Sequence, residues 1–304
     1  MTPFVHSSPE AVPRILVIGP FGQIGFELIR HLQGLGVVYA PGRPDLDLND
    51  PDSIRAVIRN FRPAIIVNAA AYTDVAGAEQ EVKLAHQING IAPGIIAEAA
   101  QQCGAALIHY STDYVFDGAK LGSYREDDPV APLNQYGISK LAGERAVAQA
   151  GCAYLIFRTS WIYGMRGRNF LSFVQREAAL GHELKIVADQ VGAPTWSGTV
   201  AALTAHVASQ GLSAGAESEG FWHQRSGVYH LTSAGTTSWH GFARAILDLL
   251  PETQRPVLTA ISSAEFRTPV RRPMNSVLDT TKFTQTFGLF PPNWVDSLAR
   301  CAGR

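Results

Sequence analysis

Short apolar runs alternate with helical patterns through the first half of this chain, and that alternation restricts the fold more than any other feature. The runs carry no polar alternation, which is typical of strands buried on both faces of a parallel sheet. They lie at residues 14–18, 37–40, 64–67, 105–110 and 154–157. Helical spacing separates them, at residues 26–32, 52–60, 78–100 and 138–150. The pattern predicts an α/β fold built on a doubly wound parallel sheet.

Beyond Trp161 the regular alternation ends, and prolines, glycines and isolated aromatic residues interrupt it. Helical patterns at 169–180 and 199–209 and a strand at 228–231 remain, and residues 211–227 read as an exposed loop. We therefore expect a dinucleotide-binding Rossmann domain mainly over 14–191, to which the strand near 228–231 returns. Residues 192–304 are expected to form mainly a smaller substrate-binding lobe, and residues 1–13 an N-terminal extension.

Composition excludes several classes of protein. Of the 304 residues, 46% are hydrophobic and 17% charged, which argues against disorder, and the net charge of −1 gives no basic surface for nucleic acid or an anionic membrane. Apolar runs are too short to span a bilayer, and the first residues lack the apolar core of a signal peptide, so a cytoplasmic location is expected. Cys103, Cys152 and Cys301 and the scattered histidines have no metal or disulfide spacing, so no metal is predicted.

A glycine-rich turn follows the first predicted strand directly. Gly19, Gly22 and Gly25 form a GxxGxxG pattern that leads into a helix. Such a turn allows a tight bend, close approach of the backbone to phosphate and close packing of the helix on the strand. The helix N-terminus then favours an anion, normally the pyrophosphate of a dinucleotide.

The residues after the second and third strands indicate how the rest of a dinucleotide would bind. Arg43 stands where folds that prefer NAD usually carry an acid, and a guanidinium suits a 2′-phosphate. NADPH is therefore the first choice, with NADH left open. Asp47 and Leu48 are placed for the adenine, and the small residues up to Ala71 favour close passage of the backbone beneath the cofactor.

Three residues form a candidate catalytic group. Tyr136 and Lys140 make a YxxxK pattern, which places both side chains on one helix face. The lysine ammonium is expected to lower the pKa of the tyrosine toward neutrality, so that Tyr136 can protonate a carbonyl oxygen. Thr112 ends the strand at 105–110, at the sheet edge where such folds bind ligands, and its hydroxyl would be a second donor.

The chain resembles the dTDP-4-dehydrorhamnose reductases, a family of extended short-chain dehydrogenases/reductases. The resemblance rests on the following segments: VIGPFGQIG, VNAAAYTDV, HYSTDYVFDG, PLNQYGISKLAGE, FRTSWIYG, DQVGAPT, YHLTSAGTTSW and RRPMNSVLD. It implies reduction of dTDP-4-dehydro-L-rhamnose in the synthesis of dTDP-L-rhamnose, for cell-envelope polysaccharide. Hydride would reach the C4 carbonyl, with catalysis by Thr112, Tyr136 and Lys140. The implied partner is a small sugar nucleotide, and a homodimer is left open.

The resemblance also implies binding residues. Those for the cofactor are Gly19, Gly22, Gln23, Ile24, Gly25, Arg43, Asp47, Leu48, Ala71, Tyr72, Thr73, Tyr136 and Lys140. Those for the substrate are Thr112, Asp113, Tyr136 and Trp161. Some relatives place magnesium on glutamates at a dimer contact, one of them matching Glu27. Gly198 stands about where a second acid would be needed, so we expect Glu27 to be a solvated helix residue and no metal to bind.

Two other functions use related sequences. A sugar-nucleotide epimerase or dehydratase shares the fold, but dehydratases of this group follow the catalytic threonine with Asp-Glu, whereas Tyr114 follows Asp113 here. A regulatory subunit of methionine adenosyltransferase is a non-catalytic relative that need not keep the catalytic residues. Because Thr112, Tyr136 and Lys140 are all present in order, catalysis is favoured.

Overall fold

The computed structural model describes residues 12–266 and 268–303. Its main sheet contains six parallel strands in the order β10-β5-β4-β3-β1-β2. The strands are β1 (Arg14–Ile18), β2 (Val37–Tyr39), β3 (Ile65–Asn68), β4 (Ala106–Thr112), β5 (Tyr154–Thr159) and β10 (Gly227–His230). From β1 the chain runs first to β2 on one side and then to β3 on the other. This reversal places a ligand crevice at the carboxyl ends of β1 and β3. Of the expected extension at 1–13, residues 1–11 lie outside the described residues.

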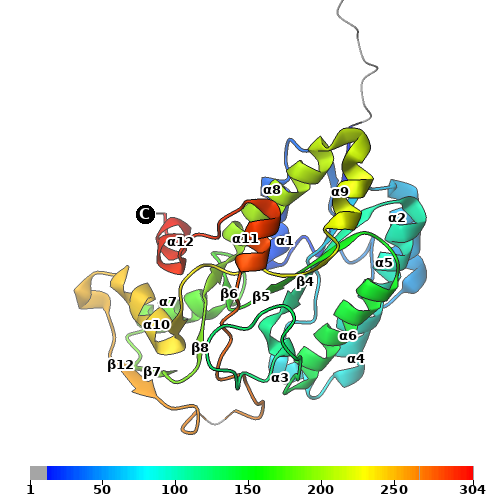
Figure 1. Ribbon diagram of the computed structural model, residues 1–304. Coiled ribbons are helices and arrows are strands. Elements are labelled where there is room, and N and C mark those ends of the chain that lie inside the picture. The colour runs from blue at the N-terminus through cyan, green and yellow to red at the C-terminus, as the bar shows by residue number, and fades with distance from the viewer. Residues whose placement is uncertain (1–11, 267, 304) are drawn as a thin grey trace, which may run out of the picture.

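Helices cover both faces of this sheet (Figure 1). Successive side chains of β1 alternate, with Ile15 and Val17 in the core of one face and Leu16 and Ile18 in the core of the other. The first face is covered by α1 (Gln23–His31), α8 (Ser197–Ser213), α9 (Ser218–Gln224) and α11 (Thr281–Phe287). The second is covered by α2 (Pro51–Phe61), α5 (Ala92–Cys103) and α6 (Gln135–Gln149). The predicted doubly wound α/β fold is confirmed.

The helix predicted over 78–100 is broken into several pieces. They are α3 (Val75–Ala78), α4 (Val82–His86), a π-helical turn η1 (Gln87–Ile91) and then α5. Asn89 lies in the wide turn, is fully buried, and bonds through its side chain to the backbone of Tyr72 and to Ser139. A continuous α-helix therefore does not form, because this polar side chain is held by groups outside the helix.

The prediction of an exposed loop at 211–227 is wrong. Helix α8 continues to Ser213, and a 3-10 turn η3 (Gly215–Glu217) and α9 follow it. Trp222 of α9 is only 4% exposed and packs in the core beside β5 and β10, with its indole directly over Gly211, where a Cβ would collide with it. Burial of that large aromatic side chain orders a segment whose small and polar residues otherwise favour a loop.

A second, smaller core lies beside the sheet edge, at the end of the molecule where Figure 1 labels α7, α10, β7 and β12. Its members include Tyr163, Phe242 and Leu298. The elements around it are β6 (Ile162–Tyr163), α7 (Phe170–Ala179), β7 (Leu184–Val187), β8 (Val191–Gly192), β9 (Thr195–Trp196), β11 (Thr237–Ser238), α10 (Trp239–Asp248), η4 (Glu252–Gln254), β12 (Leu258–Ile261) and α12 (Trp294–Cys301). The chain returns from this region to the main sheet twice, first as α8, α9 and β10 and later as α11.

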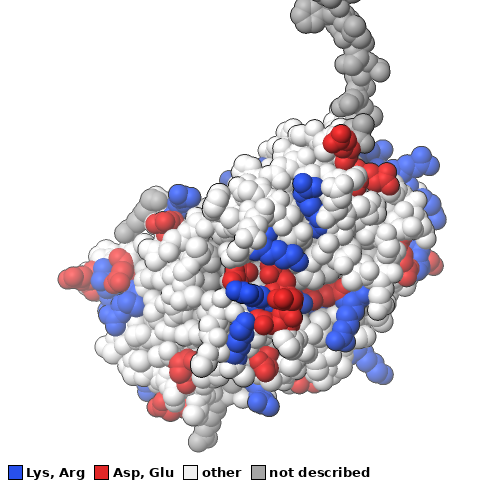
Figure 2. Space-filling view, viewed as in Figure 1, with Lys and Arg blue, Asp and Glu red and all other residues white. Residues whose placement is uncertain are grey.

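The surface carries mixed charge. Figure 2 shows acidic and basic side chains side by side near the middle of the displayed face, with wide uncharged areas around them. Arg125 and Asp279, for example, approach to 3.8 Å. Over the described ranges, no helix has both the length and the apolar character needed to cross a membrane.

Candidate active site

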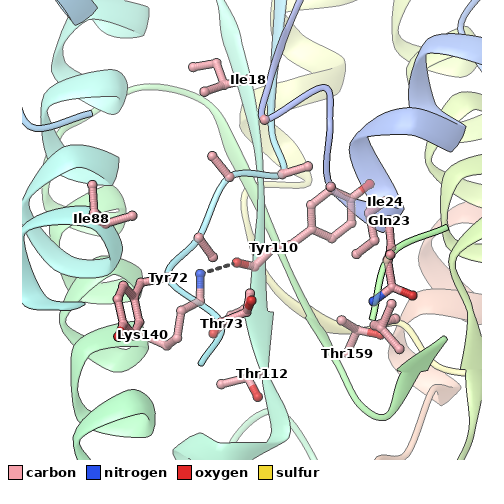
Figure 3. A pocket seen from close by; sticks show the side chains of 18 of the residues that line it. Ile18, Gln23, Ile24, Tyr72, Thr73, Ile88, Tyr110, Thr112, Lys140 and Thr159 are labelled. Atoms are coloured by element: carbon pink, nitrogen blue, oxygen red, sulfur yellow. Dashed lines mark hydrogen bonds between the residues drawn. The ribbon is translucent and has the colours of Figure 1, made fainter. Parts of the chain in front are cut away.

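A pocket of about 860 Å³ opens at the carboxyl edge of the main sheet, bordered by the ends of β1, β3, β4 and β5 and by α1 and α6 (Figure 3). Of the residues predicted to bind cofactor or substrate, Gly25 alone is outside its wall. Those that line it are Gly19, Gly22, Gln23, Ile24, Arg43, Asp47, Leu48, Ala71, Tyr72, Thr73, Thr112, Asp113, Tyr136, Lys140 and Trp161. Segments more than 100 residues apart in the sequence therefore meet around one space.

The glycine turn forms the floor under one end of the pocket. Gly19 has φ +84°, and a Cβ there would lie 2.7 Å from the backbone nitrogen of Ala70, so only glycine fits. Gly25 lies beneath the turn, where a Cβ would collide with the carbonyl oxygen of Gly19. Gly22 begins α1 without a side-chain cap. The first N–H groups of α1 are thus free of side-chain acceptors and suit a phosphate.

Gln23 is held by the neighbouring lobe. Its Oε1 accepts a hydrogen bond from Asn169 Nδ2 at 2.9 Å, and the Asn169 side chain also caps α7 by accepting from Ser172 N at 3.1 Å. Asn169 lines the pocket as well. The Gln23 side chain therefore joins the glycine turn to α7.

Arg43 and Asp47 lie at the rim. The Arg43 side chain is 78% exposed, and its Nε is 4.0 Å from Asp47 Oδ1. That carboxylate oxygen also accepts from the backbone and side-chain nitrogens of Asn49, each at 3.0 Å. Leu48 beside it is buried. The guanidinium is thus loosely held and free to contact an anion in the pocket.

Asn89 holds the loop that carries Ala71, Tyr72 and Thr73. Its Oδ1 accepts from Tyr72 N at 2.8 Å, and its Nδ2 donates to Tyr72 O at 2.9 Å and to Ser139 Oγ at 3.0 Å. The sequence gives no distinct signal for this residue, because one asparagine in a helical pattern usually lies on the surface.

Helix α6 carries Tyr136 and Lys140. Asn134 caps its N-terminus, since its side chain accepts the N–H of Gly137 at 2.9 Å. Lys140 is 2% exposed, and its Nζ donates to the carbonyl oxygen of Tyr110 at 2.7 Å, as drawn in Figure 3. Burial lowers the pKa of Lys140 to about 8, although the carboxylate of Glu144 opposes that shift.

Tyr136 lies one helical turn before Lys140 on the pocket wall. Burial raises the pKa of its phenol well above the ordinary value, and the charges of Asp113 and Tyr114 add to that effect, while a hydrogen bond with Thr112 opposes it. The expectation that Lys140 brings this pKa toward neutrality is wrong for this arrangement, because loss of solvation is the larger effect. Tyr136 is thus a protonated phenol at neutral pH.

Thr112 and Asp113 lie where β4 ends and a 3-10 turn, η2 (Asp113–Val115), begins. Thr112 Oγ1 accepts from Tyr114 N at 3.2 Å and donates to Asp113 Oδ1 at 3.1 Å. Asp113 is 3% exposed, and burial raises its pKa to about 6 against the opposing hydrogen bonds from Ser276 and Thr112. The hydroxyls of Thr112 and Tyr136 and the carboxyl of Asp113 therefore lie close together on the pocket wall.

Trp161 closes the opposite side. Its backbone has φ +49°, which is rare for a bulky residue, and its ring stacks on Trp239 with centroids 3.6 Å apart. A Cβ on Gly192 would lie 2.5 Å from this ring. Trp239 was not predicted to be near the site, because nothing in its local sequence connects it with Trp161.

The Glu27 side chain is less exposed to solvent than the sequence led us to expect. Its side chain is only 19% exposed and lies 3.8 Å from Arg30. Gly198 lies under the ring of Trp196, where a Cβ would come within 2.6 Å. Within residues 12–266 and 268–303, no three His, Cys, Asp or Glu side chains are grouped so as to hold a metal ion.

Comparison with known families and sequences gives consistent results. A family model described as the RmlD substrate binding domain matches residues 13–304. A dTDP-4-dehydrorhamnose reductase of Burkholderia thailandensis is 43% identical, with 95% of this chain and 97% of the relative covered. The dTDP-4-dehydrorhamnose reductase of Escherichia coli K12 is 41% identical, with 92% and 94% covered.

Solved structures show the same relationship. A dTDP-4-dehydrorhamnose reductase from Bacillus anthracis, solved in complex with NADP, superposes with a TM-score of 0.87 at 33% identity, covering 96% of this chain and 99% of that one. A UDP-glucose 4-epimerase from Thermus thermophilus, in complex with NAD, superposes with a TM-score of 0.73 at 20% identity, covering 94% and 98%. The second likeness is one of fold alone.

Proposed function

The chain belongs to the dTDP-4-dehydrorhamnose reductase family and is an oxidoreductase, and from this premise we propose that it reduces dTDP-4-dehydro-L-rhamnose to dTDP-L-rhamnose with NADPH. The observation that carries the proposal is the placement of the Tyr136 phenol beside the Thr112 hydroxyl on the wall of one pocket, with Lys140 one helical turn away. This is the arrangement needed to hold and protonate a carbonyl oxygen.

The residues present fit a dinucleotide. The N–H groups at the uncapped start of α1 would donate to the pyrophosphate, Gly19 and Gly22 would let the backbone approach it, and the small side chain of Ala71 would leave room for the rest of the cofactor. Arg43 at the rim favours a 2′-phosphate, and the Bacillus anthracis relative was solved with NADP. When bound, the cofactor supplies hydride to the C4 carbon of the substrate.

The protein supplies the proton. Because Tyr136 is protonated at neutral pH, its Oη can donate to the C4 oxygen as negative charge develops there. Thr112, whose hydroxyl donates to Asp113 Oδ1, would redirect that hydrogen to the same oxygen as a second donor. Lys140 in its ammonium form stabilises the phenolate that remains on Tyr136. The sugar nucleotide is placed between this sheet edge and the region after residue 192, with Asp113 and Trp161 beside the sugar.

Reduction is favoured over elimination by one local feature. Tyr114 occupies the position after Asp113 and stacks edge-on against Tyr136, with ring centroids 5.6 Å apart. An elimination would need a second acid there, and a phenol whose pKa burial raises to about 12 is a poor one.

The test is direct. Purified protein with NADPH and dTDP-4-dehydro-L-rhamnose should consume both and form dTDP-L-rhamnose in equal amount, measured by nicotinamide absorbance and product chromatography. The Tyr136→Phe variant should lose about 10²-fold or more in kcat while its NADPH affinity is kept, because only the proton donor is removed. Tyr114→Phe is the matched control that loses a neighbouring hydroxyl. No turnover by the unmodified enzyme, or equal losses in both variants, would refute the proposal.

A further inference from the structure

His109 lies inside β4 and is fully buried next to α6, yet the proposed mechanism does not use it. Its two ring nitrogens contact different neighbours. Nδ1 is 3.1 Å from Asn68 Nδ2 on β3, and Nε2 is 3.4 Å from Lys140 Nζ on α6. The imidazole therefore connects the main sheet directly to the lysine of the site.

The orientation of Asn68 determines which nitrogen of His109 carries the proton. Asn68 Oδ1 accepts the backbone N–H of Ala70 at 3.1 Å, so its amide nitrogen faces the imidazole as a donor. Nδ1 must then accept, and a neutral ring carries its hydrogen on Nε2. Burial and the charge of Lys140 both lower the pKa of His109 well below its ordinary value, so the ring is neutral.

Lys140 consequently faces a donor on one side and an acceptor on the other. Its Nζ donates to the Tyr110 carbonyl at 2.7 Å, whereas the His109 Nε2–H points at the same nitrogen. Only the neutral amine has a lone pair to accept that hydrogen. We propose that His109 is a positioning residue of the site, held by Asn68 in the Nε2–H tautomer and biasing Lys140 toward its neutral amine.

The remaining charged and titratable groups near this pair come from several elements. On α6 itself they are Tyr136 and Glu144, and Arg158 of β5 engages both oxygens of Glu144 at 2.9 and 2.7 Å. At the end of β4 they are Asp113 and Tyr114, which act on Tyr136. On the β3 side Tyr72 bonds to Glu81. Glu144 favours the ammonium form of Lys140. The Nε2–H tautomer of His109 disfavours that form, so the two residues have opposite effects on Lys140.

The consequence for catalysis rests on the proposed function. Reduction requires the Lys140 ammonium to stabilise the Tyr136 phenolate, so kcat should fall as pH rises through the pKa of Lys140, which lies at about 8. Burial is the main cause of that lowered pKa, and His109, by disfavouring the ammonium, acts in the same direction and moves the fall in kcat toward neutrality.

The proposal can be tested without turnover. With ¹³C-labelled lysine, the Cε signal of Lys140 is identified by its loss in Lys140→Met, against the signals of Lys83, Lys120, Lys185 and Lys282. Asn68→Leu frees the tautomer and His109→Leu removes the donor, and each should raise the pKa of Lys140 by about one unit, the size of one hydrogen bond.

Thr204→Val is the matched control. It removes the hydrogen bond of 2.7 Å to Tyr110 on the opposite face of β4 and should leave the pKa of Lys140 unchanged. ¹⁵N spectra of labelled histidine in the unmodified enzyme should show His109 protonated on Nε2. Protonation on Nδ1, or a pKa of Lys140 unchanged in both leucine variants, would overturn the proposal. An enzyme inactive on the sugar nucleotide would contradict the proposed function and leave these NMR outcomes intact.

In an active enzyme the pH profile gives a further check. In Asn68→Leu, the pH at which kcat falls on the basic side of the profile should rise by the same amount as the pKa that NMR records. A merely structural loss would instead lower kcat equally at every pH. A limb that stays in place while the NMR pKa moves would overturn the inferred effect of His109 on turnover.

Discussion

Trp161 and Trp239 lie face to face, with ring centroids 3.6 Å apart and 10° between their planes. Trp161 holds a positive φ at the pocket wall, and Trp239 begins α10 in the adjoining core. The stack thus supports a strained residue of the site from outside the main sheet.

Replacing Trp239 with leucine should loosen Trp161 without touching the catalytic group. We expect KM for the sugar nucleotide to rise about fivefold, since an aromatic pair is worth about 1 kcal/mol. Steady-state kinetics should show little change in KM for NADPH. A rise in both constants would instead indicate general loosening of the pocket.

Arg43 is expected to select the phosphorylated cofactor. Arg43→Ala should lower kcat/KM with NADPH about tenfold, the effect of losing one charge-assisted hydrogen bond, and leave the value with NADH little changed. The measurement is the ratio of the two values. Arg30→Ala, which removes an exposed guanidinium on α1, is the control. An unchanged ratio would place the 2′-phosphate elsewhere.

Asp113 should make the protein less stable as pH rises. Its pKa goes from 3.8 to about 6 on folding, so the folded state binds more protons between these values and the free energy of unfolding falls with rising pH across that window. Asp113→Asn should remove this fall and gain about 1–3 kcal/mol at pH 7. Urea unfolding at several pH values checks both; a flat profile in the unmodified protein contradicts the shift.

The buried pair of Arg158 and Glu144 should be sensitive to loss of one partner. Both side chains are 5% exposed, and Glu144→Gln leaves the guanidinium without a charge partner. We expect a loss of about 3–5 kcal/mol in the free energy of unfolding. Asp248→Asn, at the exposed pair with Arg255, should cost less than about 1 kcal/mol. Equal losses would mean that burial does not set the difference.

Local patterns were enough to predict the parallel sheet and the YxxxK helix. The runs at 14–18 and 105–110 are apolar because both faces of the sheet are covered, and α6 brings Tyr136 and Lys140 to one face whatever surrounds it. The glycine turn was predictable for the same reason, since Gly25 packs against the carbonyl oxygen of Gly19 within its own segment.

Contacts between distant segments were not predictable. The helix at 218–224 depends on Trp222 reaching a core formed by β5 and β10, and the stack on Trp161 depends on where α10 begins. His109 reads as one more residue of a buried strand, because only the fold shows that Asn68 and Lys140 lie on either side of it. The raised pKa of Tyr136 likewise depends on burial, which spacing alone does not give.

The wide turn at 87–91 has a consequence for how this chain tolerates insertions and deletions. Removing one residue from the π-helical turn would restore ordinary α-helical phase and let α4 run straight into α5, with most of the apolar core kept. Asn89 would then rotate away from Tyr72 and Ser139. Such a deletion should give a protein that folds but leaves the pocket loop of Ala71, Tyr72 and Thr73 untethered, so a gain in helical regularity would be a loss of function.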